Sequence, residues 1–283
     1  MEYSQNFKHS LLMTTAKSNS PIFTGSIPKN YDEYLGPMFF EPYALEIASR
    51  VEPSTVTSAL ELGCGTGRVT RQLRKVLPDH SSFIASDISP DMLAIAKEKL
   101  NGLNIDWRII NAQELPFNDN SIDLIVCSFG YMFVPDKAKA FAEACRILRP
   151  GGTLLFTTWG KLEDNEASFV FRSTLKKYFG ESLPDSFGLP TSMHDPASIK
   201  QSLQQAGFSK VKCEVVDKES VCPTSKRAAE GMTIGGSLYN EIMNRNPGWL
   251  GEIQSTVEKE LSEKYGAVPM VAPMRAIVSQ AWK

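Results

Sequence analysis

The chain has 283 residues, with 30 Lys and Arg against 32 Asp and Glu, a formal net charge of -2 and 42% hydrophobic residues. This composition is typical of globular proteins and excludes a largely disordered chain, and its charge balance argues against nucleic acid as a partner. The length favours one core domain that carries a substantial insertion.

The cysteines and the apolar runs limit the setting in which the protein works. The 5 cysteines are widely spaced and lack CxxC or Cys/His pairs, so we interpret them as reduced thiols and predict no metal site. No segment approaches the roughly 20 apolar residues of a membrane span, and residues 1–20 lack a signal-peptide core. We expect a cytoplasmic protein with no stable membrane insertion and make no prediction of its oligomeric state.

The first half of the chain begins with a polar stretch and then alternates strand and helix signals. Residues 1–29 show no sustained period and are interpreted as a mobile leader, so that residues 30–283 form the domain. Residues 31–51 predict two short helices, broken at Gly36-Pro37 and Glu41-Pro42. Further on, strands are predicted at 58–62, 83–86, 105–110, 122–128 and 153–158, and helices at 69–77, 90–100 and 137–148.

The second half predicts helices at 167–179, 196–206, 225–243 and 249–265, and strands at 211–216 and 276–282. Together these signals predict an α/β fold, a Rossmann-like, seven-stranded, mostly parallel sheet with helices on both faces. Residues 223–272 lie between the last two strands and are interpreted as a helical lid insertion near the C-terminus.

A glycine loop follows the first predicted strand and gives the strongest functional signal. Gly63, Gly65 and Gly67 are spaced G-x-G-x-G, which lets the backbone pass close beneath a ligand. A dinucleotide fingerprint, G-x-G-x-x-G, needs a third glycine where this chain has Arg68. Glu61, at the end of the strand, suits an ammonium group and repels a pyrophosphate, so a zwitterionic amino-acid tail is favoured.

Asp87 ends the second predicted strand, where a carboxylate accepts both hydroxyls of a ribose. Such a carboxylate occurs in both NAD and SAM sites and does not distinguish between them. The alternative interpretation of Asp87 is an N-cap or a loop charge. Ile88 and Met92 suit the two faces of an adenine ring, or equally an ordinary core.

Taken together, these residues resemble the class I S-adenosylmethionine (SAM)-dependent methyltransferases over about residues 31–283. Within that family the resemblance points to the small-molecule branch that contains the ubiquinone and menaquinone biosynthesis enzymes. The matching motifs are Ala59–Gly67 in the glycine loop, Ser86–Leu93 around the ribose carboxylate, Asn111–Phe117, similar to D-A-x-x-L-P-F, and Arg149-Pro-Gly-Gly before the fifth strand.

The resemblance implies a SAM site. The residues it assigns to the cofactor are Tyr31, Glu61, Gly63, Cys64, Gly65, Gly67, Asp87, Ile88, Met92, Asn111, Ala112, Gln113, Ser128 and Phe129. Asn111 departs from the family's usual Asp, and it still accepts a hydrogen bond but brings no charge. The amide near Ala112 is expected at the adenine ring, and Ser128 and Phe129 beside the methionine part. Tyr31 is expected to close over the cofactor.

The implied activity is transfer of the methyl group from SAM to a small-molecule acceptor by in-line displacement, with release of S-adenosylhomocysteine. Aromatic residues after the fourth and fifth strands, Phe129, Phe133 and Trp159 among them, favour an apolar or aromatic acceptor. His194 and Tyr131 are the candidate bases, but a surface or helix-start role for His194 and a pocket-wall role for Tyr131 are favoured, so no catalytic residue is assigned. The alternatives are an NAD(P)-dependent oxidoreductase and a non-catalytic SAM-binding module.

Overall fold

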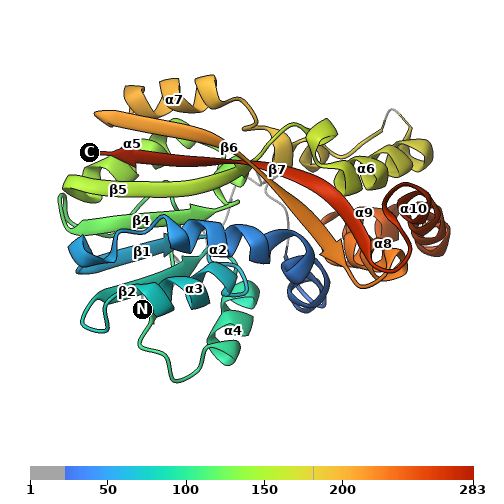
Figure 1. Ribbon diagram of the computed structural model, residues 1–283, viewed down its shortest axis with the longest axis horizontal. Helices are drawn as coiled ribbons and strands as arrows, with labels where there is room; N and C mark the ends of the chain where they lie inside the picture. The colour runs from blue at the N-terminus through green and yellow to red at the C-terminus, as the bar shows by residue number, and fades with distance from the viewer. Residues whose placement is uncertain (1–22, 181) are drawn as a thin grey trace, which may run out of the picture.

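A computed structural model describes residues 23–180 and 182–283, which build a seven-stranded sheet in the order β3-β2-β1-β4-β5-β7-β6 (Figure 1). The strands are β1 (Ser58–Leu62), β2 (Ser82–Asp87), β3 (Asp106–Ile109), β4 (Ile122–Ser128), β5 (Leu148–Trp159), β6 (Lys210–Cys222) and β7 (Met270–Trp282). The first five strands pair in parallel, and β7 is antiparallel to both of its neighbours. The predicted Rossmann-like, mostly parallel sheet is confirmed.

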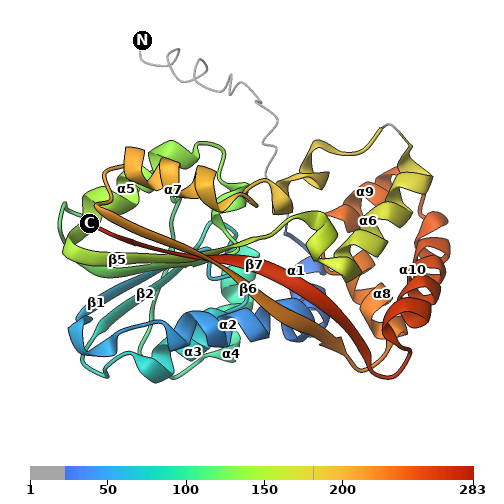
Figure 2. The same ribbon diagram turned by 45° about the horizontal axis from the view of Figure 1, so that its top comes forward.

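Helices cover both faces of this sheet (Figure 2). On one face lie α2 (Glu41–Ser49), α3 (Arg68–Val76) and α4 (Pro90–Lys99), and on the other α5 (Lys137–Ile147) and α7 (Pro196–Gln205). Ile47 of α2 and Leu73 of α3 are fully buried against Leu124 and Val126 of β4. The central strands are therefore apolar on both sides, as a parallel sheet requires.

The N-terminal helices differ from the prediction. Helix α1 (Ile27–Asn30), the π-helix η1 (Tyr31–Phe40) and α2 follow one another without a break, so the predicted interruptions are wrong. Pro42 lies in the first turn of α2, where a backbone N–H has no helical partner to lose. Pro37 lies within η1, where the wider π-turns leave room for its ring, and its side chain is exposed.

The predicted leader is described in part. Residues 1–22 lie outside the described residues, whereas Ile27 and Pro28 are buried in α1. Phe23 packs edge-on against Tyr31, with 5.8 Å between ring centroids. The end of the leader is therefore part of the folded domain.

The last two strands are longer than the sequence pattern predicts. β6 and β7 pair with each other over their whole lengths and extend past the sheet toward three helices (Figure 1). Residues 217–222 of β6 are mostly polar, and they form a strand through backbone pairing with β7, with Ser220 and Cys222 buried.

The residues between β6 and β7 are helical, with helices α8 (Ser225–Ile234), α9 (Leu238–Arg245) and α10 (Trp249–Tyr265). The sequence predicted one helix over 225–243, but Gly235, Gly236 and Ser237 separate α8 from α9. Together with α6 (Glu166–Phe179), these helices form a group at one end of the sheet (Figure 2). 

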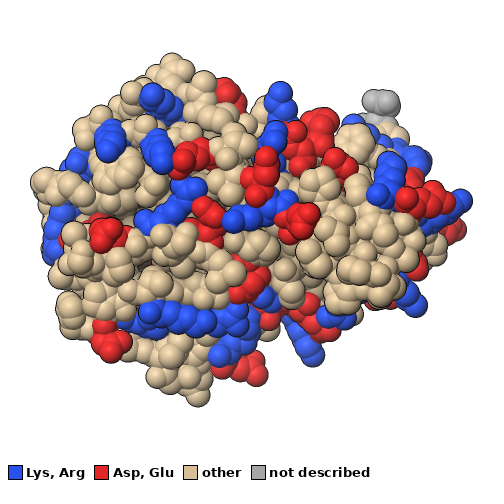
Figure 3. Space-filling view, viewed as in Figure 1, with Lys and Arg blue, Asp and Glu red and all other residues tan. Residues whose placement is uncertain are grey.

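The surface carries mixed charge. Figure 3 shows Lys and Arg interspersed with Asp and Glu over much of one face. Within residues 23–180 and 182–283, no helix is long and apolar enough to cross a membrane.

Gly231 tests the contact between α8 and η1. A Cβ at this position would lie 2.6 Å from Cβ of Tyr34, so Gly231→Ala forces the two helices apart. We expect it to lower the free energy of unfolding by about 1 to 3 kcal/mol. Urea denaturation measures this. The control is Gly251→Ala in α10, where a Cβ meets nothing within 4 Å. That change should stabilise the protein by up to about 1 kcal/mol, and equal effects of the two substitutions would contradict the packing described here.

Candidate cofactor cleft and the adjoining aromatic cavity

The glycine loop lies at the carboxyl end of β1, which pairs with β2 on one side and β4 on the other. Chain order reverses between β1 and β4, and ligands of doubly wound sheets bind at such a switch point. Gly63, Gly65 and Gly67 have φ angles of 65°, 56° and 84°, a region that favours glycine. At Gly67 a Cβ would also lie 2.9 Å from the Leu100 side chain, so this glycine lets the loop approach α4 closely.

The loop borders a small cleft of about 40 Å³, which we call the glycine-loop cleft. Its lining residues are Tyr31, Phe40, Glu61, Gly63, Cys64, Gly65, Thr66, Arg68, Val69 and Ser128. Six of them, Tyr31, Glu61, Gly63, Cys64, Gly65 and Ser128, belong to the set that the sequence predicted for a cofactor. The structure therefore brings together residues that lie up to 97 positions apart, from Tyr31 to Ser128.

Asp87 fixes the position of the glycine loop. Gly65 donates its backbone N–H to one carboxylate oxygen of Asp87 and Ser89 donates to the other, each at 2.8 Å. Burial raises the pKa of Asp87, which is 9% exposed, while these amide hydrogen bonds oppose the shift. The N-cap of α4 is Ser89 rather than Asp87. Each carboxylate oxygen keeps a further acceptor site, which suits a pair of hydroxyl donors.

Glu61 is the buried charge of the cleft. Its side chain is 1% exposed, and one carboxylate oxygen, Oε2, has no hydrogen-bond partner among the described residues. Burial raises the pKa of Glu61 from 4.5 to about 8 and the nearby Asp87 adds to the effect, while hydrogen bonds from Thr70 oppose it. A buried carboxylate without a cationic partner is unfavourable unless a cation arrives. The cleft therefore fits a ligand with an ammonium group next to the glycine loop.

A polar network that the sequence analysis missed ties the loop to the N-terminal helices. Asp32 of η1 accepts hydrogen bonds from the Thr66 hydroxyl at 2.7 Å and from Lys99 Nζ at 2.5 Å. Arg68 donates to the backbone carbonyl of Asp32 at 2.5 Å and to Glu41 at 2.9 Å. These partners are 27 to 67 positions apart, and no local pattern marks them as pairs.

Gly36 makes room for this network. A Cβ at Gly36 would lie 2.0 Å from Nε of Arg68, so the guanidinium packs directly on the helix backbone. In the sequence, Arg68 was notable only because it stands where a dinucleotide-binding motif needs glycine. In the structure it links the glycine loop to η1.

The residues predicted at the adenine ring follow β3. Asn111 is exposed, and its Oδ1 accepts a hydrogen bond from the backbone N–H of Gln113 at 3.0 Å. The Gln113 side chain in turn accepts from the backbone N–H of Asp136 at 2.8 Å. Both side chains thus shape the loop itself, while Ala112 is half-buried between them.

Ile88 and Met92 differ in their exposure to solvent. Ile88 is 67% exposed beside Asp87, whereas Met92 of α4 is 4% exposed. Only Ile88 is open to a ligand, and its exposed apolar surface is unlike that of a core residue. 

A second cavity, which we call the aromatic cavity, has a volume of about 200 Å³. Its walls are Phe23, Tyr31, Leu35, Phe39, Phe40, Phe129, Phe133, Trp159, Leu162, Asn165, Ser168, Phe171, Arg172, Ser186, Phe187, Pro190, Thr191, Met232, Gly236, Ser237 and Leu238. Tyr31 and Phe40 line the glycine-loop cleft as well, and their rings stack at 4.8 Å between centroids. The cavity and the cleft are therefore neighbours with a common wall.

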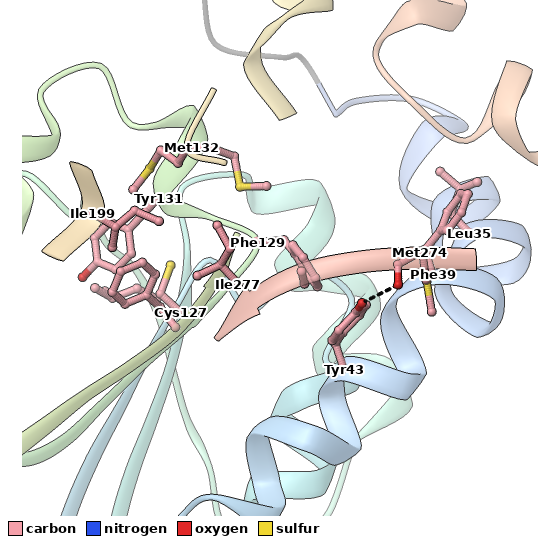
Figure 4. Packing of buried hydrophobic residues seen from close by; sticks show 14 of the residues in the cluster. Leu35, Phe39, Tyr43, Cys127, Phe129, Tyr131, Met132, Ile199, Met274 and Ile277 are labelled. Atoms are coloured by element: carbon pink, nitrogen blue, oxygen red, sulfur yellow. Dashed lines mark hydrogen bonds between the residues drawn. The ribbon is translucent and has the colours of Figure 1, made fainter. Parts of the chain in front are cut away.

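Phe129 and Trp159 form the floor of this arrangement. Their rings stack at 4.0 Å between centroids, with an interplanar angle of 19°. Phe129 has a φ of 52°, which is unusual for a bulky residue. Its backbone N–H donates a hydrogen bond to the Thr157 hydroxyl at 3.1 Å. Figure 4 shows Phe129 between the buried strands and Tyr43, whose hydroxyl donates to the Met274 carbonyl at 3.3 Å. The hydroxyl groups of Ser128 and Thr157 form a hydrogen bond of 3.0 Å.

Neither candidate base lines the cleft or the cavity. Tyr131 is fully buried beside Cys127 and Met132 (Figure 4), and burial raises the pKa of its hydroxyl well above the ordinary value. His194 is exposed, and its Nδ1 lies 2.9 Å from the Thr191 carbonyl. The geometry thus supports a structural interpretation of both residues.

Comparison with known proteins agrees with this geometry. A family model described as "Methyltransferase domain" matches residues 60–156. The ubiquinone/menaquinone biosynthesis C-methyltransferase UbiE of Pseudoalteromonas translucida is 34% identical over 200 residues, which are 65% of this chain and 80% of that protein. Demethylmenaquinone methyltransferase of Staphylococcus haemolyticus is 30% identical over 210 residues, 66% of this chain and 84% of that protein.

Solved structures share the fold. Phosphoethanolamine N-methyltransferase 2 of Haemonchus contortus, determined in complex with S-adenosylhomocysteine, superimposes with a TM-score of 0.57 at 19% identity. The similarity covers 90% of this chain and 56% of that one.

Glu61 makes stability depend on pH. The unfolded carboxyl ionises near 4.5 and the folded one near 8, so the folded state holds an extra proton between these values and its stability falls as pH rises through the window. Glu61→Gln removes this dependence. Without ligand, we expect the variant to be more stable than the wild type by on the order of a few kcal/mol at the upper end of the window, and less so near its lower end.

Denaturation curves at several pH values check this, with Glu98→Gln on the exposed surface of α4 as control. A Glu61→Gln variant that is less stable than the wild type across the window would mean that the carboxylate has a partner.

Proposed function

The chain belongs to the class I SAM-dependent methyltransferases, and from that premise we propose that it methylates an apolar, aromatic small molecule bound in the aromatic cavity. The family membership establishes SAM as the cofactor and a small molecule as the acceptor. The observation that carries the aromatic acceptor is the wall of stacked rings that the cavity shares with the glycine-loop cleft. The two similar enzymes are named for quinone biosynthesis, which supports an acceptor with a ring.

The described residues fit the cofactor. When bound, SAM supplies a methyl group on a sulfonium centre. We assign the buried Glu61 carboxylate to the ammonium group of the amino-acid tail of SAM, because Oε2 of Glu61 has no hydrogen-bond partner among the described residues. Asp87, fixed by two backbone amides, is assigned to the ribose hydroxyls, and the exposed Ile88 to a face of the adenine. 

We propose the remaining cofactor contacts from the position of each residue in the structure. Tyr31, which lines both the cleft and the cavity, is assigned to the closure over the cofactor. Ser128 and Phe129 are assigned to the methionine part, and the loop Asn111-Ala112-Gln113 to the adenine edge.

Positioning is the main catalytic contribution that we assign to this chain. Holding two reactants in line supplies about 7 to 11 kcal/mol of barrier reduction. Phe129 and Trp159 form a flat, rigid wall for a ring, and aromatic faces stabilise a nearby positive charge. Among the described lining residues of the cavity there is no His, Asp or Glu, so we assign no general base.

The helices between β6 and β7 have a place in this proposal. Met232 of α8 and Leu238 of α9 line the aromatic cavity, together with Gly236 and Ser237 between them. The sequence predicted a lid over residues 223–272, but residues 270–272 belong to β7. We propose that residues 223–269 act as a lid that excludes water from the acceptor, as methyl transfer requires.

The direct test is transfer of labelled methyl from SAM to a panel of ring compounds with phenol, amine or acidic carbon positions, with the full chain as enzyme. We expect label in at least one aromatic product and an equal amount of S-adenosylhomocysteine. Saturable NADH binding without SAM binding would favour an oxidoreductase. Label that enters only non-aromatic acceptors from a cell extract would contradict the aromatic acceptor, and recovery of intact SAM with every acceptor and extract would favour a non-catalytic binding module.

Asp87→Ala tests the ribose assignment. It removes two charge-assisted hydrogen bonds, each worth about 1.5 to 3 kcal/mol, so SAM binding should weaken by about 100-fold or more. Calorimetry measures the affinity, and Asp79→Ala, at an exposed position after α3, is the control. Unchanged affinity of the Asp87 variant would place the ribose elsewhere.

A further inference from the structure

Arg172 of α6 is a charged residue in a cavity that is otherwise apolar or neutral. Among the described lining residues of the aromatic cavity, it is the one with a formal charge. Asn165, Ser168 and Arg172 follow one another at intervals of three and four, so one side of α6 faces the cavity. The Arg172 residue is 9% exposed, which makes it a buried cation.

Among the described side chains, no carboxylate forms an ion pair with Arg172, and Glu163 acts on it only from a distance. The Arg172 guanidinium stacks over the Phe187 ring at 4.3 Å from the centroid, and one Nη donates a long hydrogen bond of 3.4 Å to the Thr191 hydroxyl. Nε has no partner, and no ion pair of Arg172 is found among the side chains that the structure describes. Burial lowers the pKa of Arg172 to about 10, because desolvation of the guanidinium outweighs the opposing effect of the Glu163 carboxylate.

A buried guanidinium without an anion is unfavourable, and Phe187 stabilises one face only. The N–H groups at the edge of the guanidinium remain available to a ligand. Arg68, near the glycine loop, shows the opposite situation, because Glu41 and Asp32 both contact it. Asn165 is also satisfied, since it donates to the Lys161 and Arg275 carbonyls and accepts from the Arg275 backbone N–H. Arg172 therefore stands out in the cavity as an unfilled hydrogen-bonding group.

We propose that Arg172 binds a carboxylate on the acceptor, so that the molecule methylated in the aromatic cavity is an aromatic acid with a single negative charge. This inference rests on the proposed function and specifies its substrate class. A planar guanidinium matches a carboxylate with two parallel hydrogen bonds. One cation balances one negative charge, which favours a monoanion over a phosphate ester. Ser168 and Thr191 offer hydroxyl groups on the same wall. The stacked rings of Phe129 and Trp159 then hold the aromatic part.

The test compares two probes of the same shape, 2-naphthoate and 2-naphthamide, titrated by calorimetry into the full chain with S-adenosylhomocysteine present. The wild type should bind the acid at least ten times more tightly than the amide. Arg172→Gln should remove this preference and leave the affinity for the amide nearly unchanged, whereas Arg172→Lys should keep part of it. The control is Arg245→Gln, since Arg245 also lies over a phenylalanine ring, that of Phe179, but is exposed and does not line the cavity.

Equal affinity of the wild type for the two probes, or no measurable binding of either, would contradict the proposal. So would an Arg172→Gln variant that still prefers the acid. The affinity for S-adenosylhomocysteine, measured on the same samples, separates this failure from a failure of the proposed function. A wild type that binds S-adenosylhomocysteine but does not distinguish acid from amide contradicts the role of Arg172 alone. A wild type that fails to bind S-adenosylhomocysteine contradicts the cofactor site on which both proposals rest.

Discussion

The buried carboxylate of Glu61 is the constraint around which the cleft is organised. It is the penultimate residue of β1, beside the central strand β4, and one of its oxygens has no hydrogen-bond partner among the described residues. A carboxylate in that state reduces stability above its ordinary pKa, so the fold must compensate elsewhere. Stabilising hydrogen bonds lie around Glu61. Asp87 fixes the glycine loop through backbone amides, and Asp32, Arg68 and Lys99 link the same loop to η1. The rigid surroundings keep the carboxylate in place for a cation.

Two different parts of the chain build the cleft and the cavity. The family model matches residues 60–156, which contain the glycine loop, Asp87 and the loop after β3. Most of the aromatic cavity comes from segments outside that range, namely the N-terminal helices, α6 and the helices between β6 and β7. Similarity to known enzymes therefore establishes the cofactor chemistry, while the acceptor depends on residues such as Trp159, Arg172 and Met232, which the matched domain does not include.

Local patterns predicted most of the sheet and the glycine-loop end of the site. Strand 58–62 was correct to the residue, because its buried run and the three glycines are both local signals. The break at Pro37 was wrong, since a π-helix admits a proline that an α-helix excludes. Residues 217–222 were missed because they are mostly polar in sequence, and only pairing with β7 shows them to be a strand. The roles of Arg68 and Arg172 depend on partners distant in sequence, or on their absence, which only the tertiary structure reveals.

We infer that Glu61 holds a proton in the free protein and releases it when the ammonium group of the cofactor binds. Calorimetry of S-adenosylhomocysteine binding near pH 7, in two buffers with different ionisation enthalpies, measures the protons exchanged on binding. Because the pKa of free Glu61 is about 8, the wild type should release close to one proton per molecule bound, and Glu61→Gln should release almost none. Binding by the wild type without proton release would contradict the claim.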